Sequence, residues 1–147
     1  MEKPANEGEP MAPVLVYGSL KRGLANHHWL RGARFLGEAA MAGLALFDLG
    51  PFPMAVPSGD GALLHGELYA VDPGQLAQLD VLEGTPRLYE RRRHPLLAGG
   101  DAWVYVGRPA QVRHSPRIPT GRWPGPSQGR RTTPEPRPEA RPEAQPQ

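Results

Sequence analysis

The sequence predicts an α+β domain, in which short strands and one helix pack around a single core. About six runs rich in β-branched and aromatic residues are separated by glycine or proline turns. Only one segment has apolar residues at helical spacing, so strands and helices do not alternate as in a parallel βαβ sheet. With 147 residues, the chain is long enough for one domain of ordinary size.

The first strand is predicted over residues 13–17, where a continuous apolar run is typical of a strand buried on both faces. After a glycine-containing loop, Asn26 is placed to cap a short helical turn. Between residues 33 and 56 we expect two strands, bent or bulged at glycines. Residues 50–53 should form a turn, because two prolines so close together cannot join a ladder.

Residues 63–71 are predicted as a strand with two distinct faces. A helix should follow over residues 73–82, because Asp72 is a good N-cap and Gln75 stands where a capping box would need it. Gly84 is expected to end this helix. Two further strands, joined by a glycine turn, are expected near residues 89–97 and 102–106.

The two ends of the chain differ in composition from its centre. Residues 111–147 contain 9 prolines and few large apolar side chains, which predicts a disordered tail. We therefore expect a flexible leader over residues 1–12, a folded domain over 13–110 and a Pro/Arg-rich tail over 111–147. The tail has seven Arg and three Glu, so the basic charge belongs to the tail, and residues 1–110 together carry a net charge of −2. This distribution argues against nucleic-acid binding.

Composition also excludes several classes of site and location. The chain has no cysteine, which excludes disulfides, thiol catalysis and thiolate metal sites. The histidines lack the spacing of a metal site, so no metal is expected. No apolar run approaches the ~20 residues of a membrane span, and the N-terminus lacks the apolar region of a signal peptide. These features predict a cytoplasmic protein that does not enter a membrane.

The loop that follows the first strand, residues 17–23, is the first candidate for a binding site. A strand that opens into a glycine turn can leave successive backbone N–H groups free to hold an anion, although many such turns are only turns. A phosphate-binding P-loop is excluded because the required Gly and Lys spacing is absent. Ser19 also lacks the glycines that flank the nucleophile of a serine hydrolase.

Glu83 is the second candidate, because it falls in the last turn of the predicted helix. A carboxylate is unfavourable at that end of the helix dipole, and partial burial would raise its pKa further toward that of a general base. An exposed glutamate at a fraying end is the alternative. Glu67 is a rival base that could instead pair with one of the arginines at 91–93.

Four ordered blocks give the chain a recognisable family pattern. They read Val-Tyr-Gly-Ser-Leu-Lys-Arg-Gly from Val16 with Asn26-His27, Gly-Glu-Leu-Tyr-Ala-Val from Gly66, Leu-Asp-Val-Leu-Glu-Gly from Leu79, and Pro86 with Tyr89 and Arg91. Across residues 13–107 the sequence resembles the γ-glutamylcyclotransferase-like (AIG2-like) family, with most similarity to its γ-glutamylamine cyclotransferase branch. The segment between residues 33 and 61 matches the family poorly.

The resemblance implies a small mixed-sheet β-barrel with flanking helices and an enzyme that needs no cofactor. It implies that Tyr17, Gly18, Ser19 and Leu20 bind the substrate's α-carboxylate, that Glu83 is catalytic, and that Tyr89 lines the pocket. The implied reaction is that of a lyase or acyltransferase, in which the α-amine of a small γ-glutamyl compound attacks its γ-carbonyl and yields 5-oxoproline and a free amine.

The substrate could be a γ-glutamyl amino acid, γ-glutamyl-ε-lysine or a γ-glutamylated secondary metabolite, and glutathione is disfavoured. Two other functions stay open. The same fold could be a non-catalytic module that binds a small carboxylate, or the proline-rich tail could dock partners in polyproline II form.

Overall fold

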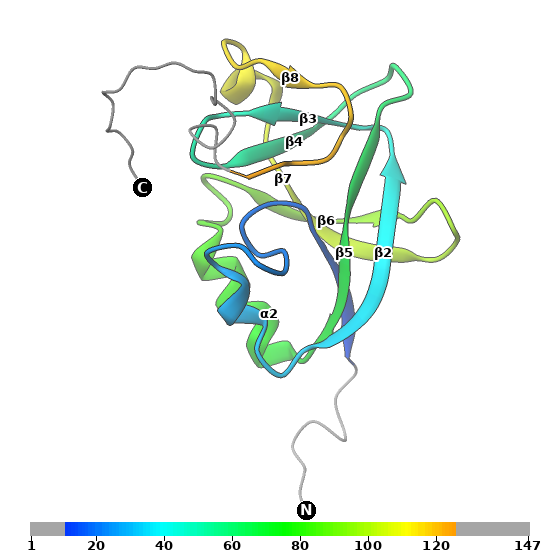
Figure 1. Cartoon of the computed structure of the whole chain (residues 1–147), viewed down its shortest axis with the longest axis vertical. Coiled ribbons are helices and arrows are strands. Elements are labelled where there is room, and N and C mark those ends of the chain that lie inside the picture. Colours follow the sequence, from blue (N-terminus) through cyan, green and yellow to red (C-terminus); the bar gives the residue numbers. More distant parts are fainter. Residues whose placement is uncertain (1–10, 126–147) are drawn as a thin grey trace, which may run out of the picture.

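One strongly curled mixed sheet forms the domain in the computed structural model, which describes residues 11–125 (Figure 1). Within these residues the sheet has eight strands: seven follow the order β2-β5-β1-β7-β4-β3-β8, and the eighth, β6, pairs with β7 beside this path. The strands are β1 (Ala12–Val16), β2 (Arg34–Ala42), β3 (Leu44–Asp48), β4 (Pro53–Pro57), β5 (Leu63–Val71), β6 (Glu90–Pro95), β7 (Asp101–Val106) and β8 (Arg117–Ile118). The predicted α+β class is confirmed, as a sheet curled into a half-barrel.

The β1 strand lies at the centre of this sheet. It pairs antiparallel with β5 and parallel with β7, so both of its edges are hydrogen-bonded to neighbouring strands. Val14 and Leu15 are both fully buried, but they belong to opposite sides of the sheet and to two different core clusters. A continuous apolar run is therefore required here, as the sequence predicted, and the end of β1 is held rigidly where the loop of residues 17–23 begins.

One α-helix, α2 (Pro73–Leu82), covers one side of the sheet within the described residues, together with the short 3-10 turn η1 (His27–Leu30). Asp72 caps α2 by accepting a hydrogen bond from the Gln75 backbone N–H at 2.7 Å, as predicted. The Gln75 side chain does not complete a capping box: its amide donates to the Arg31 carbonyl oxygen at 3.1 Å. That bond fastens the helix to the segment after η1. A second 3-10 turn, η2 (Pro109–Val112), follows β7.

The segment between residues 33 and 56 contains three strands, so the expectation of two was wrong. The third is β4, which begins at Pro53 within the turn that the prolines were expected to form. Proline is tolerated as the first residue of a strand, where its missing N–H costs no ladder bond. β4 then pairs antiparallel with β3 and parallel with β7 through Ala55 and Val106.

The expected end of the domain near residue 110 was also wrong. The chain continues through η2 and β8, which pairs with β3, and the Trp123 side chain is only 3% exposed within the core. The Gly121 carbonyl oxygen accepts a hydrogen bond from the His65 backbone N–H at 2.9 Å. Residues 111–125 therefore belong to the fold. The leader up to residue 10 and the tail from residue 126 lie outside the described residues.

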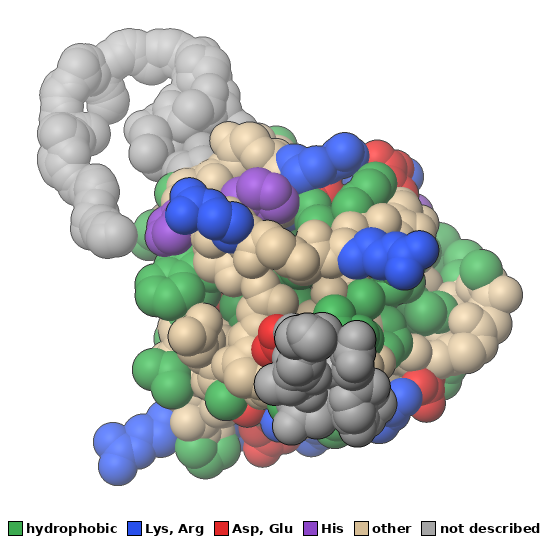
Figure 2. Space-filling view, turned by 90° about the horizontal axis from the view of Figure 1, so that it is seen from below, with side chains coloured by type: hydrophobic (Ala, Val, Ile, Leu, Met, Phe, Trp, Pro, Cys, Tyr) green, Lys and Arg blue, Asp and Glu red, His purple; other side chains and the backbone are tan. Residues whose placement is uncertain are grey.

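Two surface properties bear on the expected partners. On the face shown in Figure 2, Lys and Arg side chains are scattered among hydrophobic ones rather than gathered into one basic stripe. Within residues 11–125, no helix is both long and apolar enough to cross a membrane.

Candidate active site

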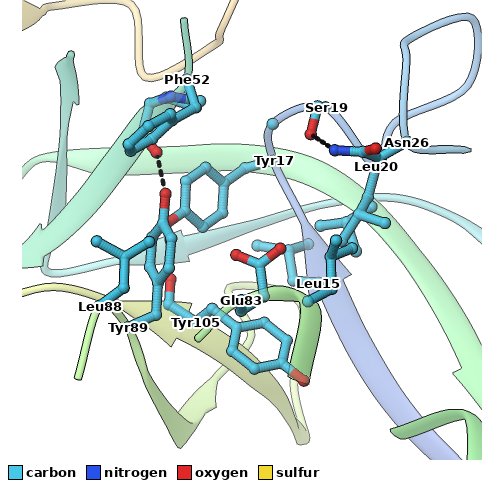
Figure 3. Close-up of a pocket in the computed structure, with 14 residues that line it drawn as sticks. Leu15, Tyr17, Ser19, Leu20, Asn26, Phe52, Glu83, Leu88, Tyr89 and Tyr105 are labelled. Atoms are coloured by element: carbon cyan, nitrogen blue, oxygen red, sulfur yellow. Dashed lines mark hydrogen bonds between the residues drawn. The ribbon is translucent and has the colours of Figure 1, made fainter. Parts of the chain in front are cut away.

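A cavity of about 150 Å³ lies where the end of β1, the start of β4 and the end of α2 meet (Figure 3). It contains all six residues that the sequence singled out for binding or catalysis. The full lining is Leu15, Val16, Tyr17, Gly18, Ser19, Leu20, Asn26, Phe52, Pro53, Leu82, Glu83, Leu88, Tyr89 and Tyr105.

Glu83 enters the cavity because α2 ends at this residue. Its backbone N–H still bonds the Leu79 carbonyl oxygen at 2.9 Å, so its position is set by the last turn of the helix. The next residue, Gly84, has φ +68°, a left-handed conformation that reverses the chain and that other residues seldom adopt. The carboxylate points into the cavity, between Leu15 and the ring of Tyr17 in the view of Figure 3.

The surroundings of Glu83 change its acid–base behaviour. Burial among cavity residues raises the pKa of Glu83 to about 7, because desolvation penalises the charged carboxylate. Among the described residues, no side chain or backbone group is recorded as a hydrogen-bond or ion-pair partner of this carboxylate. A carboxyl group that is neither paired nor fully hydrated, with a pKa near neutrality, can both accept and donate a proton.

Three buried tyrosine rings surround Glu83, and the hydroxyl of each is held by the protein. Tyr17 donates to the Tyr105 carbonyl oxygen at 2.6 Å and accepts from the Ala55 N–H at 3.0 Å. Tyr89 donates to the Pro53 carbonyl oxygen at 2.7 Å, and Tyr105 donates to Asp80 Oδ1 at 2.8 Å. Burial raises the pKa of all three hydroxyls, and the charge of Glu83 raises them further. They act as rigid walls, which leaves Glu83 as the group able to exchange protons.

Gly18 is closely packed, so that a side chain at this position would press on its neighbours. A Cβ atom at this position would lie 3.1 Å from the Pro53 ring and 3.9 Å from the Trp123 indole. The loop after β1 is therefore wedged between the start of β4 and the C-terminal segment. Lys21 strengthens this arrangement, since its ammonium donates to the Trp123 carbonyl oxygen at 2.9 Å.

The backbone of the same loop has free donors. Within residues 11–125, the backbone N–H groups of Gly18, Ser19 and Leu20 have no hydrogen-bond acceptor, although all three residues line the cavity. The Lys21 N–H, in contrast, bonds the Gly18 carbonyl oxygen at 3.0 Å and closes the turn. Successive unpaired N–H groups at a cavity wall are suited to an anionic ligand.

Asn26 differs from its expected role. It stands at the cap position of η1, but its side chain makes no capping bond and instead donates to Ser19 Oγ at 2.8 Å. Asn26 therefore ties η1 to the binding loop, and it lines the cavity as well.

The rival carboxylate, Glu67, lies outside the cavity and is fully engaged. It accepts from the Arg22 backbone N–H at 2.9 Å and from the Tyr69 hydroxyl at 3.0 Å, and it forms an ion pair with the Arg22 guanidinium at 3.6 Å. The expected pairing of Glu67 with one of the arginines at 91–93 was wrong: among the described residues its ionic partner is Arg22, and Arg91 instead binds Asp80 through two hydrogen bonds of 2.8 and 3.1 Å. Across residues 11–125, no three His, Asp or Glu side chains gather as a metal site requires.

Sequence reasoning missed eight of the 14 residues that line the cavity, among them Phe52, Leu88, Tyr105 and Asn26. Phe52 lies in the segment that matches the family poorly, and Leu88 lies between two recognised positions. Tyr105 belongs to a predicted strand, but the last three residues of that strand are all buried, so no alternation in the sequence marks it as a cavity residue. Asn26 was noticed, but for capping.

Comparison with known proteins places these features in a family. The family model described as gamma-glutamyl cyclotransferase, AIG2-like, matches residues 14–125. An Escherichia coli protein named gamma-glutamylcyclotransferase family protein YtfP is 40% identical over 95 residues, covering 63% of this chain and 80% of its own. Human gamma-glutamylaminecyclotransferase is 40% identical over 92 residues, covering 55% of this chain and 59% of its own.

A solved structure agrees with the fold. The crystal structure of an AIG2-like protein from Mus musculus superposes with a TM-score of 0.70 at 26% identity, covering 81% of this chain and 93% of the mouse protein. The residues matched by the family model include the loop after β1, the end of α2 and the C-terminal segment that holds Trp123. This chain therefore belongs to the AIG2-like gamma-glutamyl cyclotransferase family.

Proposed function

We propose that this protein converts a γ-glutamyl amine or γ-glutamyl amino acid into 5-oxoproline and a free amine, with Glu83 as the proton-transfer group. The observation that carries the proposal is the unpaired Glu83 carboxyl group, whose pKa is raised to about 7 inside a cavity lined by the binding loop. Family membership and the names of the relatives support the same class of reaction.

The reaction requires only movement of protons and one acyl transfer. Glu83 takes a proton from the substrate's α-ammonium group, and the freed amine attacks the γ-carbonyl carbon to close a five-membered ring. The protonated Glu83 then gives this proton to the departing nitrogen as the old carbon–nitrogen bond breaks. One carboxyl group serves as base and then as acid, for which a pKa near neutrality is well suited. After ring closure the attacking nitrogen carries one proton more than the amide of 5-oxoproline, and Glu83 takes up this second proton and passes it to the released amine, which leaves as an ammonium ion. Bonds and protons then balance without any oxidant or reductant.

The loop after β1 supplies orientation in this proposal. The unpaired N–H groups of Gly18, Ser19 and Leu20 bind the substrate's α-carboxylate and hold the chain in the folded pose that ring closure needs. A donor of the same loop is also suited to the oxyanion that forms on the γ-carbonyl oxygen. The tyrosine walls exclude water, which strengthens these interactions.

A panel of γ-glutamyl compounds incubated with the protein tests this function. We expect mass spectrometry to detect 5-oxoproline and the released amine in equal amounts. Glu83→Gln should lower kcat by roughly two to four orders of magnitude, since it removes the proton acceptor and keeps the shape of the side chain. Glu67→Gln is the matched control, because Glu67 lies outside the cavity, and it should keep most of the activity.

Two results would contradict the proposal. If Glu83→Gln kept its activity while a folded Glu67→Gln lost it, the base would be Glu67. If no compound were turned over but small carboxylates still bound to the loop, the cavity would belong to a binding module rather than to an enzyme.

A further inference from the structure

The cavity has two chemically different sides, and the side away from the loop has no assigned role. In Figure 3, Ser19, Leu20 and Asn26 lie on one side of the Glu83 carboxylate, and Phe52, Leu88 and Tyr89 lie on the other. If the α-carboxylate occupies the loop and the reacting atoms lie beside Glu83, the departing amine points toward Phe52 and Leu88. We name these two residues the apolar rim. This argument rests on the proposed function.

The apolar rim is fixed in place although it is partly open to solvent. Leu88 is 41% exposed, yet its backbone N–H bonds the Gly84 carbonyl oxygen at 2.9 Å and its carbonyl oxygen accepts from Gln111 Nε2 at 2.9 Å. The Phe52 ring packs against the Tyr89 ring, with centroids 6.4 Å apart. An exposed apolar side chain that is held on both sides is a preformed contact surface for a ligand.

Charge is distributed very unevenly around the cavity. Among the described residues that line it, Glu83 is the only one whose side chain is an acid or a base that ordinarily carries charge. The lining residues on the side of Phe52 and Leu88 are uncharged, so none of them would pair with an ammonium or carboxylate group on the departing amine. Near Leu88, the Arg108 guanidinium donates to the Arg87 carbonyl oxygen at 2.8 Å, which adds positive charge beside the rim. A cationic group would therefore meet apolar side chains and a like charge.

We propose that the apolar rim of Phe52 and Leu88 binds the leaving group, and that the preferred substrates are γ-glutamyl amides of neutral, apolar amines. Among the open substrates, this choice disfavours γ-glutamyl-ε-lysine, which carries charges at the far end of its leaving group. Each methylene that the rim removes from water should raise kcat/KM about fourfold, from the usual ~0.8 kcal/mol per buried methylene.

The test uses γ-glutamyl n-alkylamides from methyl to butyl, together with the 4-aminobutyl amide. The n-alkyl leaving amines have similar basicity, so differences in kcat/KM report binding at the rim. We expect the value to rise about fourfold per methylene and the butyl amide to be preferred over its 4-aminobutyl counterpart. A flat series, or a preference for the cationic compound, would overturn the proposal.

Variants at the rim provide a matched comparison. Leu88→Asp should shift the ratio of butyl to 4-aminobutyl turnover by about tenfold in favour of the cation, because a carboxylate then faces the ammonium group. Val81→Asp adds the same charge on α2 at a residue that is 82% exposed and outside the cavity, and it should leave the ratio unchanged. Equal shifts in both variants would show that the rim does not contact the leaving group.

A binding measurement separates this proposal from the proposed function. Glutaric acid mono-n-alkylamides keep the carboxylate, the amide and the alkyl chain but lack the α-amine, so they cannot cyclise. Calorimetry should give a Kd that falls about fourfold per methylene. If γ-glutamyl compounds are not turned over but this trend holds, the proposed cyclisation is contradicted and binding at the apolar rim is supported. If turnover occurs and neither series depends on chain length, binding at the apolar rim is contradicted and the proposed cyclisation is supported.

Discussion

Glu83 and Glu67 are both partly buried carboxylates within the same domain, yet the protein treats them in opposite ways. Glu67, on β5, has an arginine, a backbone N–H and a tyrosine hydroxyl around it, and it lies outside the cavity. Glu83, at the end of α2, has no recorded partner among the described residues and points into the cavity. The contrast shows how one protein makes one glutamate structural and leaves another able to exchange protons.

The largest difference in kcat between the two sites should come from substitutions that shift each carboxylate without removing it. Glu83→Asp withdraws the group by one methylene, and kcat should fall by about a hundredfold, the scale expected for a misplacement of ~1 Å. Glu67→Asp should change kcat little, because Glu67 lies outside the cavity. Steady-state rates of 5-oxoproline formation measure both, and similar losses in the two variants would remove the distinction.

In the loop after β1, the stability of the fold and the binding of substrate should depend on the packing of Gly18 more than on the Ser19 hydroxyl. Gly18→Val should destabilise the fold by about 1–3 kcal/mol, because its Cβ would press on the Pro53 ring, and it should raise KM by displacing the loop. Ser19→Ala removes one contact with Asn26 and should cost about 1 kcal/mol with little change in kcat. Denaturant melts and rate measurements test the pair. A loss in Ser19→Ala equal to that in Glu83→Gln would require a role for the hydroxyl in the chemistry.

The pH dependence of stability should also distinguish the two sites. The folded chain raises the pKa of Glu83 from 4.5 to about 7, so it binds this proton more tightly than the unfolded chain does. The resulting stabilisation is fully present below pH 4.5 and is lost as the pH rises through about 7. The Glu83→Gln variant does not lose stability in this way, because the amide side chain does not titrate.

The thermal midpoint of Glu83→Gln relative to wild type should therefore increase across this range and then level off. Thermal melts at several pH values measure the difference. In Glu67→Gln, the weakened contacts with Arg22 and Tyr69 should instead lower the midpoint at neutral pH. A constant offset between Glu83→Gln and wild type at every pH would indicate that the folded state does not shift this pKa.

The smallest expected effect concerns the ion pair of Glu67. The Arg22 side chain is 53% exposed, and exposed pairs contribute about 0–1 kcal/mol. Arg22→Ala should therefore change the free energy of unfolding by less than about 1 kcal/mol, because Glu67 keeps its bonds with the backbone of residue 22 and with Tyr69. A loss well above this value would mean that the guanidinium, through Glu67 or through its contact with the Phe35 ring at 4.2 Å, contributes more than an exposed ion pair does.

The sequence was most informative where local signals agreed with each other. The buried run before residue 18, the cap at Asp72 and the glycine after Glu83 each predicted an element that the structure contains. These signals depend on backbone preferences and burial within a few residues, so they can be read from a single sequence. Three of the four family blocks then contain residues that the fold gathers in one cavity, and the block at residues 66–71 does not.

The errors came from contacts between distant segments. β4 begins at Pro53, which suggests a turn locally but serves as a strand start when β3 and β7 flank it. Trp123 lies in a segment poor in apolar residues, and its burial follows from packing against the loop at Gly18, more than a hundred residues earlier. Neither arrangement leaves a periodic pattern in the sequence.

The titration of the Glu83 carboxyl carbon by ¹³C NMR tests the central claim most directly. The resonance would be assigned by its absence in Glu83→Gln, in a protein labelled at the glutamate carboxyl carbons. Burial in the cavity predicts a midpoint near pH 7 for this carbon. A midpoint near 4.5, the value of an ordinary glutamate, would show that Glu83 is solvated like a surface side chain, and it would contradict its role as the proton carrier of the site.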